Sequence, residues 1–460
     1  MKTSIEECLS AQKDFFRSGA TRDYHFRINA LQRLQQAILD REEEISRALG
    51  ADLNKSPFET YMCETGMVLS EISHAKKHLH RWMRKKRVKT PLAQFFSRSF
   101  TIHEPYGSVL ILSPWNYPFM LSLDALAGVI AAGNCAVISP SEYAPVTAGV
   151  IRRMLGEIFP EEYIAVADGG IECNQKLLAQ HFDYIFFTGS PRVGRIVMKA
   201  AAEHLTPVTL ELGGKSPCIV DETADLRIAA RRLAFGKCLN AGQTCVAPDY
   251  LLVQESVRDA FLDLLKQEII SMYGEHPLMN PNLVRIISHS HYERILRLIG
   301  DSRGSVFFGG RGDELTLKIE PTILTDISPE DPVMQEELFA PVLPVLTFRT
   351  LKEACRLTEQ HEKPLALYLF TSDRNTEKKI LSEIPFGGGC INDTIIHLAT
   401  PYMGFGGVGN SGIGSYHGKK SFETFSHEKS ILKKSTKIDL PIRYQPETER
   451  KNRLLRLFLK

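Results

Sequence analysis

The chain has 460 residues, 43% hydrophobic and 24% charged, a balance typical of a globular protein rather than a disordered or fibrous one. This length exceeds what a single core usually holds, so we expect two or more domains. A formal net charge of +2 argues against a surface built to hold a polyanion. One basic run, residues 81–89, is interpreted as a solvated helix end or linker, and no nucleic-acid partner is expected.

The nine cysteines are scattered and form no CxxC pair. This pattern argues against a disulfide framework and a structural zinc site, and it favours a reducing compartment. The first 39 residues lack the charged and then apolar order of a signal peptide. The most apolar stretch, Met120–Ala132, is too short to span a bilayer and contains Asp124. We therefore expect a cytoplasmic protein.

Two kinds of pattern follow one another along the first half of the chain. Up to residue 80, apolar residues recur three and four positions apart, as in Ile28, Leu31, Leu34 and Ile38, which predicts helices. From residue 105, short apolar runs alternate with helical stretches, which predicts βαβ units in a parallel, doubly wound sheet covered on both faces. The expected strands are 108–112, 135–138, 163–166 and 184–187.

A second α/β series follows Gly213-Gly214. It has expected strands at 218–220, 250–254 and 321–324, and helices from 226 and 257, which indicates another α/β domain. The C-terminal segment Arg453–Lys460 is basic and amphipathic. We expect it to pack on its own protein or on a partner subunit, and contact with a membrane surface is the alternative.

Cys245 is a candidate nucleophile. It follows a helical pattern that ends near Leu239 and a turn of small residues, 240–242, which leave room for a substrate. Backbone N–H groups at such a junction favour a thiolate. The alternative is a buried structural cysteine, the commoner fate of a free thiol.

Glu211 is a candidate general base. It ends an apolar strand pattern, and burial raises the pKa of a carboxyl toward the range that suits base catalysis. The alternative is a salt bridge to Lys215 or to an arginine.

Asn116 is a candidate oxyanion donor. It directly follows the expected strand 108–112, and ligands of open α/β sheets lie beyond the carboxyl ends of strands. Two flanking prolines, Pro114 and Pro118, stiffen the turn. The alternative is an Asx turn in which the side chain caps its own loop.

Two further segments suit a nucleotide. The turn 187–194, Phe-Thr-Gly-Ser-Pro-Arg-Val-Gly, lies between an expected strand and a helix, where backbone N–H groups favour a pyrophosphate, although it is neither GxGxxG nor a P-loop. In 336–341, Glu337 is placed to hold a ribose hydroxyl and Phe339 to lie beside a nicotinamide; the alternative is a plain helix end.

Together these motifs, in this order, resemble the aldehyde dehydrogenase superfamily over nearly the whole chain. The resemblance rests on the PWN, FTGS, ELGGKSP, GQTC and EExFxP segments and on the spacing from Glu211 to Cys245. The glycine-rich run 405–412 and the segment 415–422 resemble the class 3 branch.

The resemblance implies a fold and a division of the chain. It implies an α/β protein of the aldehyde dehydrogenase fold, with a Rossmann-like coenzyme-binding domain, a second α/β catalytic domain and a small bridging β element for oligomerisation. The expected segments are 1–84 and 104–209 for coenzyme binding, 210–398 for catalysis, 85–103 and 428–440 for bridging, and 441–460 for the tail. A homodimer is expected.

The resemblance also implies the roles of single residues in an NAD(P)-dependent oxidation of an aldehyde to a carboxylic acid. Cys245 is implied as the nucleophile, Glu211 as the base for the deacylating water, and Asn116 with the Cys245 backbone N–H as the oxyanion hole. No metal is expected. The implied cofactor-binding residues are Trp115, Glu142, Gly189, Ser190, Gly194, Leu212, Gly213, Glu337 and Phe339.

The chain departs from the family pattern at two positions. Ser139 stands where lysine commonly precedes Pro-Ser-Glu, which removes a cation near the adenosine ribose and favours NAD, with NADP as the alternative. Ala340 replaces a usual glycine.

Class 3 relatives imply a medium- or long-chain aliphatic or an aromatic aldehyde. Two other functions stay open: a CoA-acylating dehydrogenase, against which Glu211 argues, and a non-catalytic binding protein on the same fold.

Overall fold

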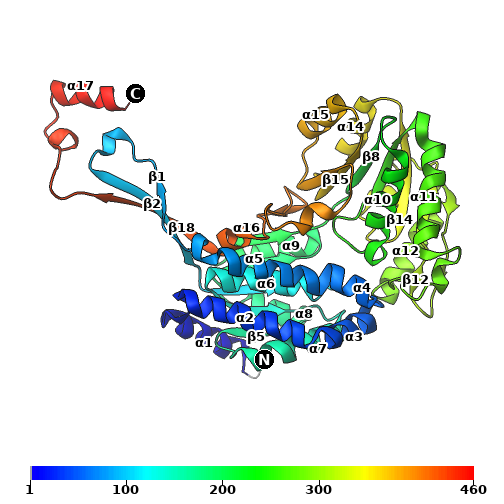
Figure 1. Ribbon diagram of the computed structural model, residues 1–460, viewed down its shortest axis with the longest axis horizontal. Coiled ribbons are helices and arrows are strands. Elements are labelled where there is room, and N and C mark those ends of the chain that lie inside the picture. Colours follow the sequence, from blue (N-terminus) through cyan, green and yellow to red (C-terminus); the bar gives the residue numbers. More distant parts are fainter. Residues whose placement is uncertain (1–2, 460) are drawn as a thin grey trace.

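The computed structural model describes residues 3–459, which form two α/β bodies and a projecting arm (Figure 1). The expected α/β architecture is confirmed. No helix within residues 3–459 is both long and apolar enough to cross a membrane. The most apolar helix, α6 (Met120–Ala132), is instead buried along its whole length inside the protein.

Helices form the first layer, as the periodicity predicts. Leu31, Leu34 and Ile38 are fully buried on one face of their helix, and Asp23 begins that helix by accepting from the Phe26 backbone N–H. A π-helical turn, Tyr61–Thr65, joins the last two helices. The helices of this layer are α1 (Ile5–Arg17), α2 (Tyr24–Asp40), α3 (Glu42–Leu53), α4 (Pro57–Thr60) and α5 (Gly66–Trp82).

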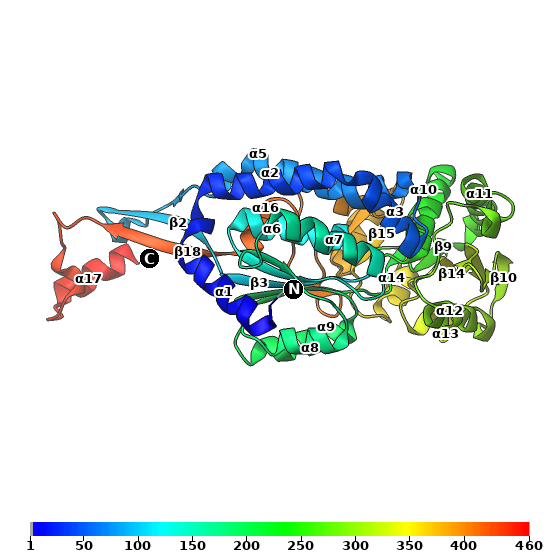
Figure 2. The ribbon, with the colours of Figure 1, turned by 90° about the horizontal axis from the view of Figure 1, so that it is seen from below.

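The first sheet has six strands in the order β17-β7-β6-β3-β4-β5. Figure 2 shows helices on both of its faces, with α6 and α7 on one side and α8 and α9 on the other. The strands are β3 (Ser108–Leu112), β4 (Cys135–Ser139), β5 (Ile164–Val166), β6 (Tyr184–Thr188), β7 (Val208–Glu211) and β17 (Gly412–Ile413). The other helices are α7 (Pro145–Ile158), α8 (Ile171–Leu178) and α9 (Pro191–Ala202).

The second sheet has seven strands in the order β10-β13-β14-β9-β8-β15-β16. Its strands are β8 (Pro217–Val220), β9 (Tyr250–Gln254), β10 (Ser305–Phe308), β13 (Thr322–Thr325), β14 (Val342–Phe348), β15 (Ala366–Phe370) and β16 (Gly388–Ile391), with a separate hairpin of β11 (Gly312–Asp313) and β12 (Lys318–Ile319). Its helices are α10 (Leu226–Cys238), α11 (Arg258–Tyr273), α12 (His289–Asp301), α13 (Pro332–Gln335), α14 (Leu351–Glu359) and α15 (Arg374–Glu383).

The first sheet is parallel as expected apart from one edge strand, and the second sheet also has one antiparallel edge strand. β17 is antiparallel to β7, with Gly412 opposite Glu211, and β10 is antiparallel to β13. β17 comes from a glycine-rich segment about 200 residues after β7 in the chain, so a local pattern of hydrophobicity cannot predict that the two strands pair.

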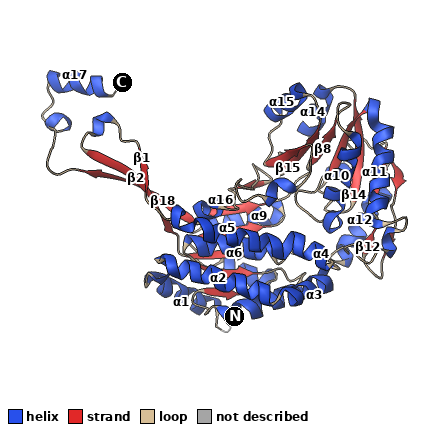
Figure 3. Ribbon diagram, in the orientation of Figure 1, coloured by secondary structure: helices blue, strands red, loops and turns tan. Residues whose placement is uncertain are grey.

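The arm is a three-stranded antiparallel sheet that extends from the first body (Figures 1 and 3). It contains β1 (Lys86–Val88), β2 (Ser97–Pro105) and β18 (Ser426–Lys434), and the short helix α16 (Lys419–Thr424) precedes β18. The C-terminal helix α17 (Glu449–Phe458) lies near the tip of the arm and has no buried residue, so within one chain the tail does not pack on the body. The strands overlap the expected bridging segments, and the exact division into domains stays a prediction.

Candidate active site

The carboxyl ends of β3, β6 and β7 open into a cavity of about 660 Å³ that also reaches the second body. The strand-end segments 113–116, 188–190 and 211–213 meet in it because the parallel strands end at one edge of the sheet, and the second body adds Glu337 and Phe339. Eleven of the twelve expected site residues line this cavity: Trp115, Asn116, Glu142, Gly189, Ser190, Glu211, Leu212, Gly213, Cys245, Glu337 and Phe339.

Cys245 lies in a loop that directly follows α10. Asn240 and Ala241 both have φ of +52°, and Gly242 has φ of +69°. A Cβ on Gly242 would approach the Ala340 carbonyl oxygen to 2.2 Å, so this tight turn requires glycine. The Asn240 backbone N–H donates to Glu59 Oε1 at 2.9 Å, which holds the strained turn in place.

The Cys245 side chain is half-buried and faces open space, unlike the buried cysteines Cys135, Cys218 and Cys238. Burial raises the pKa of its thiol to about 12, with a further rise from the carboxylates of Glu337 and Glu211. The backbone N–H groups of Cys245 and Val246 oppose this rise. The thiol is therefore protonated in this state and has donors beside it that stabilise an anion.

Glu211 is the last residue of β7 and is 3% exposed. Among the described atoms, neither carboxyl oxygen has a hydrogen-bond partner. Burial raises its pKa well above the usual range. The salt bridge considered for Lys215 is not formed, because the Lys215 Nζ pairs with Asp249 Oδ2 at 2.5 Å. Burial thus favours the neutral form of Glu211, and both of its carboxyl oxygens are without a protein partner among the described atoms.

Asn116 is buried in the turn after β3, and its side chain makes no Asx turn. Its Nδ2 donates to the backbone carbonyl of Gln243, which lies two residues before Cys245 in the chain, at 3.0 Å. The Asn116 carbonyl accepts from Asn240 Nδ2 and from Lys55 Nζ, each at 2.9 Å. A carboxamide has two N–H groups, so one remains for an oxygen in the cavity that Asn116 lines.

The turn after β6 has the geometry of an anion site. Ser190 is the N-cap of α9 and accepts from the Val193 backbone N–H at 3.4 Å. Gly189 donates its N–H to the Glu211 carbonyl at 2.9 Å, which ties this turn to the end of β7. Gly194, the twelfth expected residue, is absent from the described cavity lining. A Cβ on Gly194 would come 2.7 Å from the Leu212 side chain, so glycine at this position permits close packing of α9 on the loop after β7.

The second body supplies Glu337 and Phe339. A Cβ on Gly213 would lie 2.1 Å from Glu337 Oε2, so glycine leaves room there for the Glu337 carboxyl group. Burial, together with the charge of Asp249, raises the pKa of Glu337 to about 8. The Phe339 ring meets the Trp115 ring edge to face at 5.4 Å.

The residues present fit a dinucleotide. A helix N-terminus with Ser190 as its cap suits a pyrophosphate, and Glu142, exposed on the cavity wall, suits a ribose hydroxyl. The Ser139 hydroxyl is buried and donates to Asn174 Oδ1 at 2.6 Å, so position 139 presents no cation to a 2′-phosphate.

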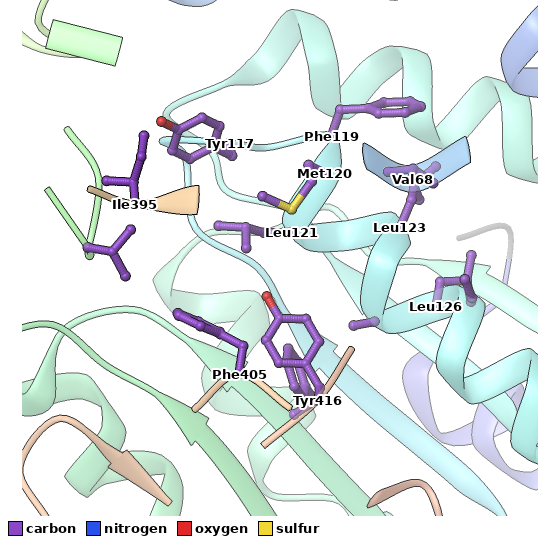
Figure 4. Packing of buried hydrophobic residues seen from close by; sticks show 14 of the residues in the cluster. Val68, Tyr117, Phe119, Met120, Leu121, Leu123, Leu126, Ile395, Phe405 and Tyr416 are labelled. Carbon is purple, nitrogen blue, oxygen red and sulfur yellow. The ribbon is translucent and has the colours of Figure 1, made fainter. Parts of the chain in front are cut away.

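A second, apolar cavity of about 170 Å³ reaches Cys245 from the other side. Figure 4 shows Tyr117, Met120, Leu121, Ile395, Phe405 and Tyr416 around this region. Sequence reasoning did not identify this lining, because it comes from the turn 61–65, from α6 and from residues 395–417, and each residue alone has the pattern of a core residue. Met62, Cys63, Met67 and Phe235 complete much of the wall.

Comparisons with known proteins show the family to which the chain belongs. The sequence model of the protein family described as "Aldehyde dehydrogenase family" matches residues 1–431. A 4,4'-diaponeurosporen-aldehyde dehydrogenase of Staphylococcus aureus is 48% identical over 442 residues, 96% of each chain. A dimeric NADP-preferring aldehyde dehydrogenase of Rattus norvegicus is 44% identical over 435 residues, 94% of this chain and 95% of that one. A substrate-bound structure of Staphylococcus aureus AldH superposes with a TM-score of 0.97 at 47% identity and covers 100% of both chains.

Proposed function

Because this chain belongs to the aldehyde dehydrogenase family, whose members oxidise aldehydes with NAD(P), we propose the residues that perform this reaction here. The observation that carries the proposal is that Cys245, Glu211 and Asn116 line one cavity, and that a second, apolar cavity also ends at Cys245. The first cavity has the residues for a dinucleotide, and the second has the lining for an aldehyde.

The first half-reaction forms a covalent bond to the enzyme. The Cys245 thiol gives up its proton to water, the thiolate sulfur attacks the aldehyde carbon, and the resulting oxyanion of the thiohemiacetal accepts from the Asn116 side chain and the Cys245 backbone N–H. When bound, NAD(P) supplies the hydride acceptor and a positively charged ring that favours the Cys245 thiolate. The product of this half-reaction is a thioester on Cys245.

The second half-reaction releases the acid. Glu211, as its carboxylate, takes a proton from water, and the water oxygen attacks the thioester carbon. The same two donors stabilise the second oxyanion. The Cys245 sulfur then leaves, and the carboxylic acid departs. A single-turnover experiment that separates NADH formation from acid release tests this order of steps.

The aldehyde is proposed to be hydrophobic, either medium- or long-chain aliphatic or aromatic. The wall of the second cavity is almost entirely apolar, so a polar aldehyde would lose its hydration there without new hydrogen bonds. A panel of aldehydes of increasing chain length tests this, and a higher kcat/KM for short hydrophilic aldehydes would contradict it. The same panel with CoA present identifies an acyl-CoA product, the outcome expected of a CoA-acylating enzyme. No NADH from any aldehyde would favour a non-catalytic protein.

NAD is proposed as the preferred cofactor, although one relative is named as NADP-preferring. Glu142 lines the cavity as a hydroxyl acceptor, whereas the hydroxyl of Ser139 is engaged by Asn174. A kcat/KM that is higher with NADP than with NAD would refute this preference.

A homodimer in a reducing compartment such as the cytoplasm is also proposed. The arm leaves large apolar side chains exposed, including Leu92 at 72% and Phe95 at 51%, and a second copy would bury them. All nine cysteines are free. Light scattering after size-exclusion chromatography measures the oligomeric state, and a monomer at micromolar concentration would contradict the dimer.

A further inference from the structure

Lys55 and Glu64 form an ion pair that is completely enclosed, with both side chains 0% exposed. Lys55 Nζ lies 2.5 Å from Glu64 Oε1. Lys55 follows α3 in a left-handed turn at Asn54, and Glu64 lies in the π-helical turn Tyr61–Thr65. Burying two charges is costly, and such a pair is poor evidence of a contribution to stability by itself. Its hydrogen bonds indicate another role.

Lys55 holds the start of the segment 116–120. Besides its bond to Glu64, its Nζ donates to the Asn116 carbonyl at 2.9 Å. The same ammonium lies 4.0 Å from the centre of the Tyr117 ring. Tyr117 in turn shares a hydrogen bond of 2.7 Å with Thr244, the neighbour of Cys245. One cation therefore fixes the backbone at the proposed oxyanion donor and the ring beside it.

Glu64 holds the end of the same segment. Its Oε2 accepts from the backbone N–H groups of Phe119 and Met120, at 3.2 Å and 2.8 Å. They belong to the N-cap and the first residue of α6, where a negative charge is stabilised by the helix dipole. Lys55 and Glu64 thus fasten both ends of a segment only five residues long.

We propose that the buried Lys55–Glu64 pair is a positioning device that aims the Asn116 side chain at the oxyanion, through its bonds to the backbone of residues 116, 119 and 120. This inference rests on the proposed role of Asn116. Neither residue of the pair lines the cavity of Cys245, so neither touches the substrate within the described structure. A displacement of about 1 Å at a catalytic group can lower a rate by about 100-fold.

The test separates positioning from stability. The double variant Lys55→Met with Glu64→Leu removes both charges and keeps the approximate volumes, a replacement that often leaves stability unchanged. We expect kcat and the single-turnover rate of NADH formation to fall about 10- to 100-fold, while the KM for NAD is unchanged. Glu64→Gln keeps the side-chain volume and one acceptor oxygen, and serves as the second variant if the double variant does not fold; a smaller loss of kcat is expected.

A cycle with Asn116→Ala identifies the route of the effect. If the pair acts through Asn116, Asn116→Ala lowers kcat much less in the double variant than in the native chain. Arg27→Met is the matched control, because Arg27 is a buried cation that donates to the Ala131 carbonyl at the opposite end of α6, 3.1 Å away. It should lower the melting temperature and leave kcat unchanged.

Three outcomes decide between the possibilities. Native kcat in both pair variants, with a large loss for Asn116→Ala, overturns this inference and leaves the proposed function intact. Fully additive losses in the cycle also overturn it. Native kcat for Asn116→Ala removes the oxyanion donor from the proposed function, and this inference with it.

Discussion

The Tyr117 hydroxyl lies 2.7 Å from the Thr244 hydroxyl, so a hydrogen bond joins the turn after β3 to the loop that carries Cys245. Tyr117 is buried against the second cavity, and burial raises the pKa of its phenol well above the usual value. This contact connects the first sheet to the loop that carries the proposed nucleophile.

Tyr117→Phe removes that bond and keeps the ring under Lys55. Loss of one buried hydrogen bond costs about 1–3 kcal/mol because Thr244 is left without its partner. We expect a lower melting temperature and a kcat reduced by less than for loss of an oxyanion donor. Calorimetry and steady-state kinetics with one aldehyde measure both, and an unchanged melting temperature would show that the bond contributes nothing.

Asn116→Ala removes the proposed side-chain donor to the oxyanion. Such a loss typically lowers kcat by about 100- to 1000-fold. Binding of NAD, measured by protein fluorescence, should stay native because Asn116 makes its described hydrogen bonds to protein groups near Cys245. A near-native kcat would exclude Asn116 from the mechanism.

Glu211→Gln should uncouple the two half-reactions. NADH forms in a rapid burst while the thioester accumulates, and steady-state turnover is slow because no carboxylate takes the proton from water. In the native enzyme, deacylation should accelerate as pH rises, since burial raises the pKa of Glu211 and only the ionised form is a base. Stopped-flow measurements across pH test this. Turnover that is native in rate and in pH dependence would refute the base role.

The substitution Glu211→Gln should also change how the stability of the folded protein depends on pH. The folded protein keeps the Glu211 proton at pH values where the unfolded chain loses it, so folding binds a proton. The contribution of Glu211 to stability is therefore lost progressively as pH rises above the unfolded pKa of about 4.3. Glu211→Gln should be less sensitive to rising pH than the native protein, as measured by urea unfolding at several pH values.

Cys245→Ala should abolish NADH formation from every aldehyde while dinucleotide binding persists, because the proposed cofactor residues lie on other segments. Cys238→Ala is the control, since that thiol is buried in the core and lines neither cavity. NADH formation by Cys245→Ala would end its assignment as the nucleophile.

Deletion of residues 441–460 tests the tail. Helix α17 is exposed in the single chain and has apolar residues such as Leu457, 68% exposed, beside basic ones. If the tail covers the mouth of a substrate tunnel, deletion changes the preference for chain length. If it rests on lipid, deletion instead abolishes binding to anionic vesicles. No change in either measurement would exclude both roles.

The sequence by itself determined many of the local elements and supplied the candidates for the site. Apolar runs placed the seven expected strands to within a residue or two, and residues at strand ends, such as Asn116 and Glu211, became candidates because a polar group after a buried strand has a defined position in an open sheet. The short motifs also carried the resemblance to the family, which the family match confirms.

Only the tertiary structure decided which residues meet across long separations. The antiparallel β17, the apolar wall around Tyr416 and the Lys55–Glu64 pair come from segments whose local patterns are those of ordinary loops and helices. A lysine nine residues before a glutamate has no periodicity that predicts contact. Their meeting depends on the π-helical turn and on the packing of α5 against α6, where a buried charge is stable only because its partner and its backbone donors are already in place.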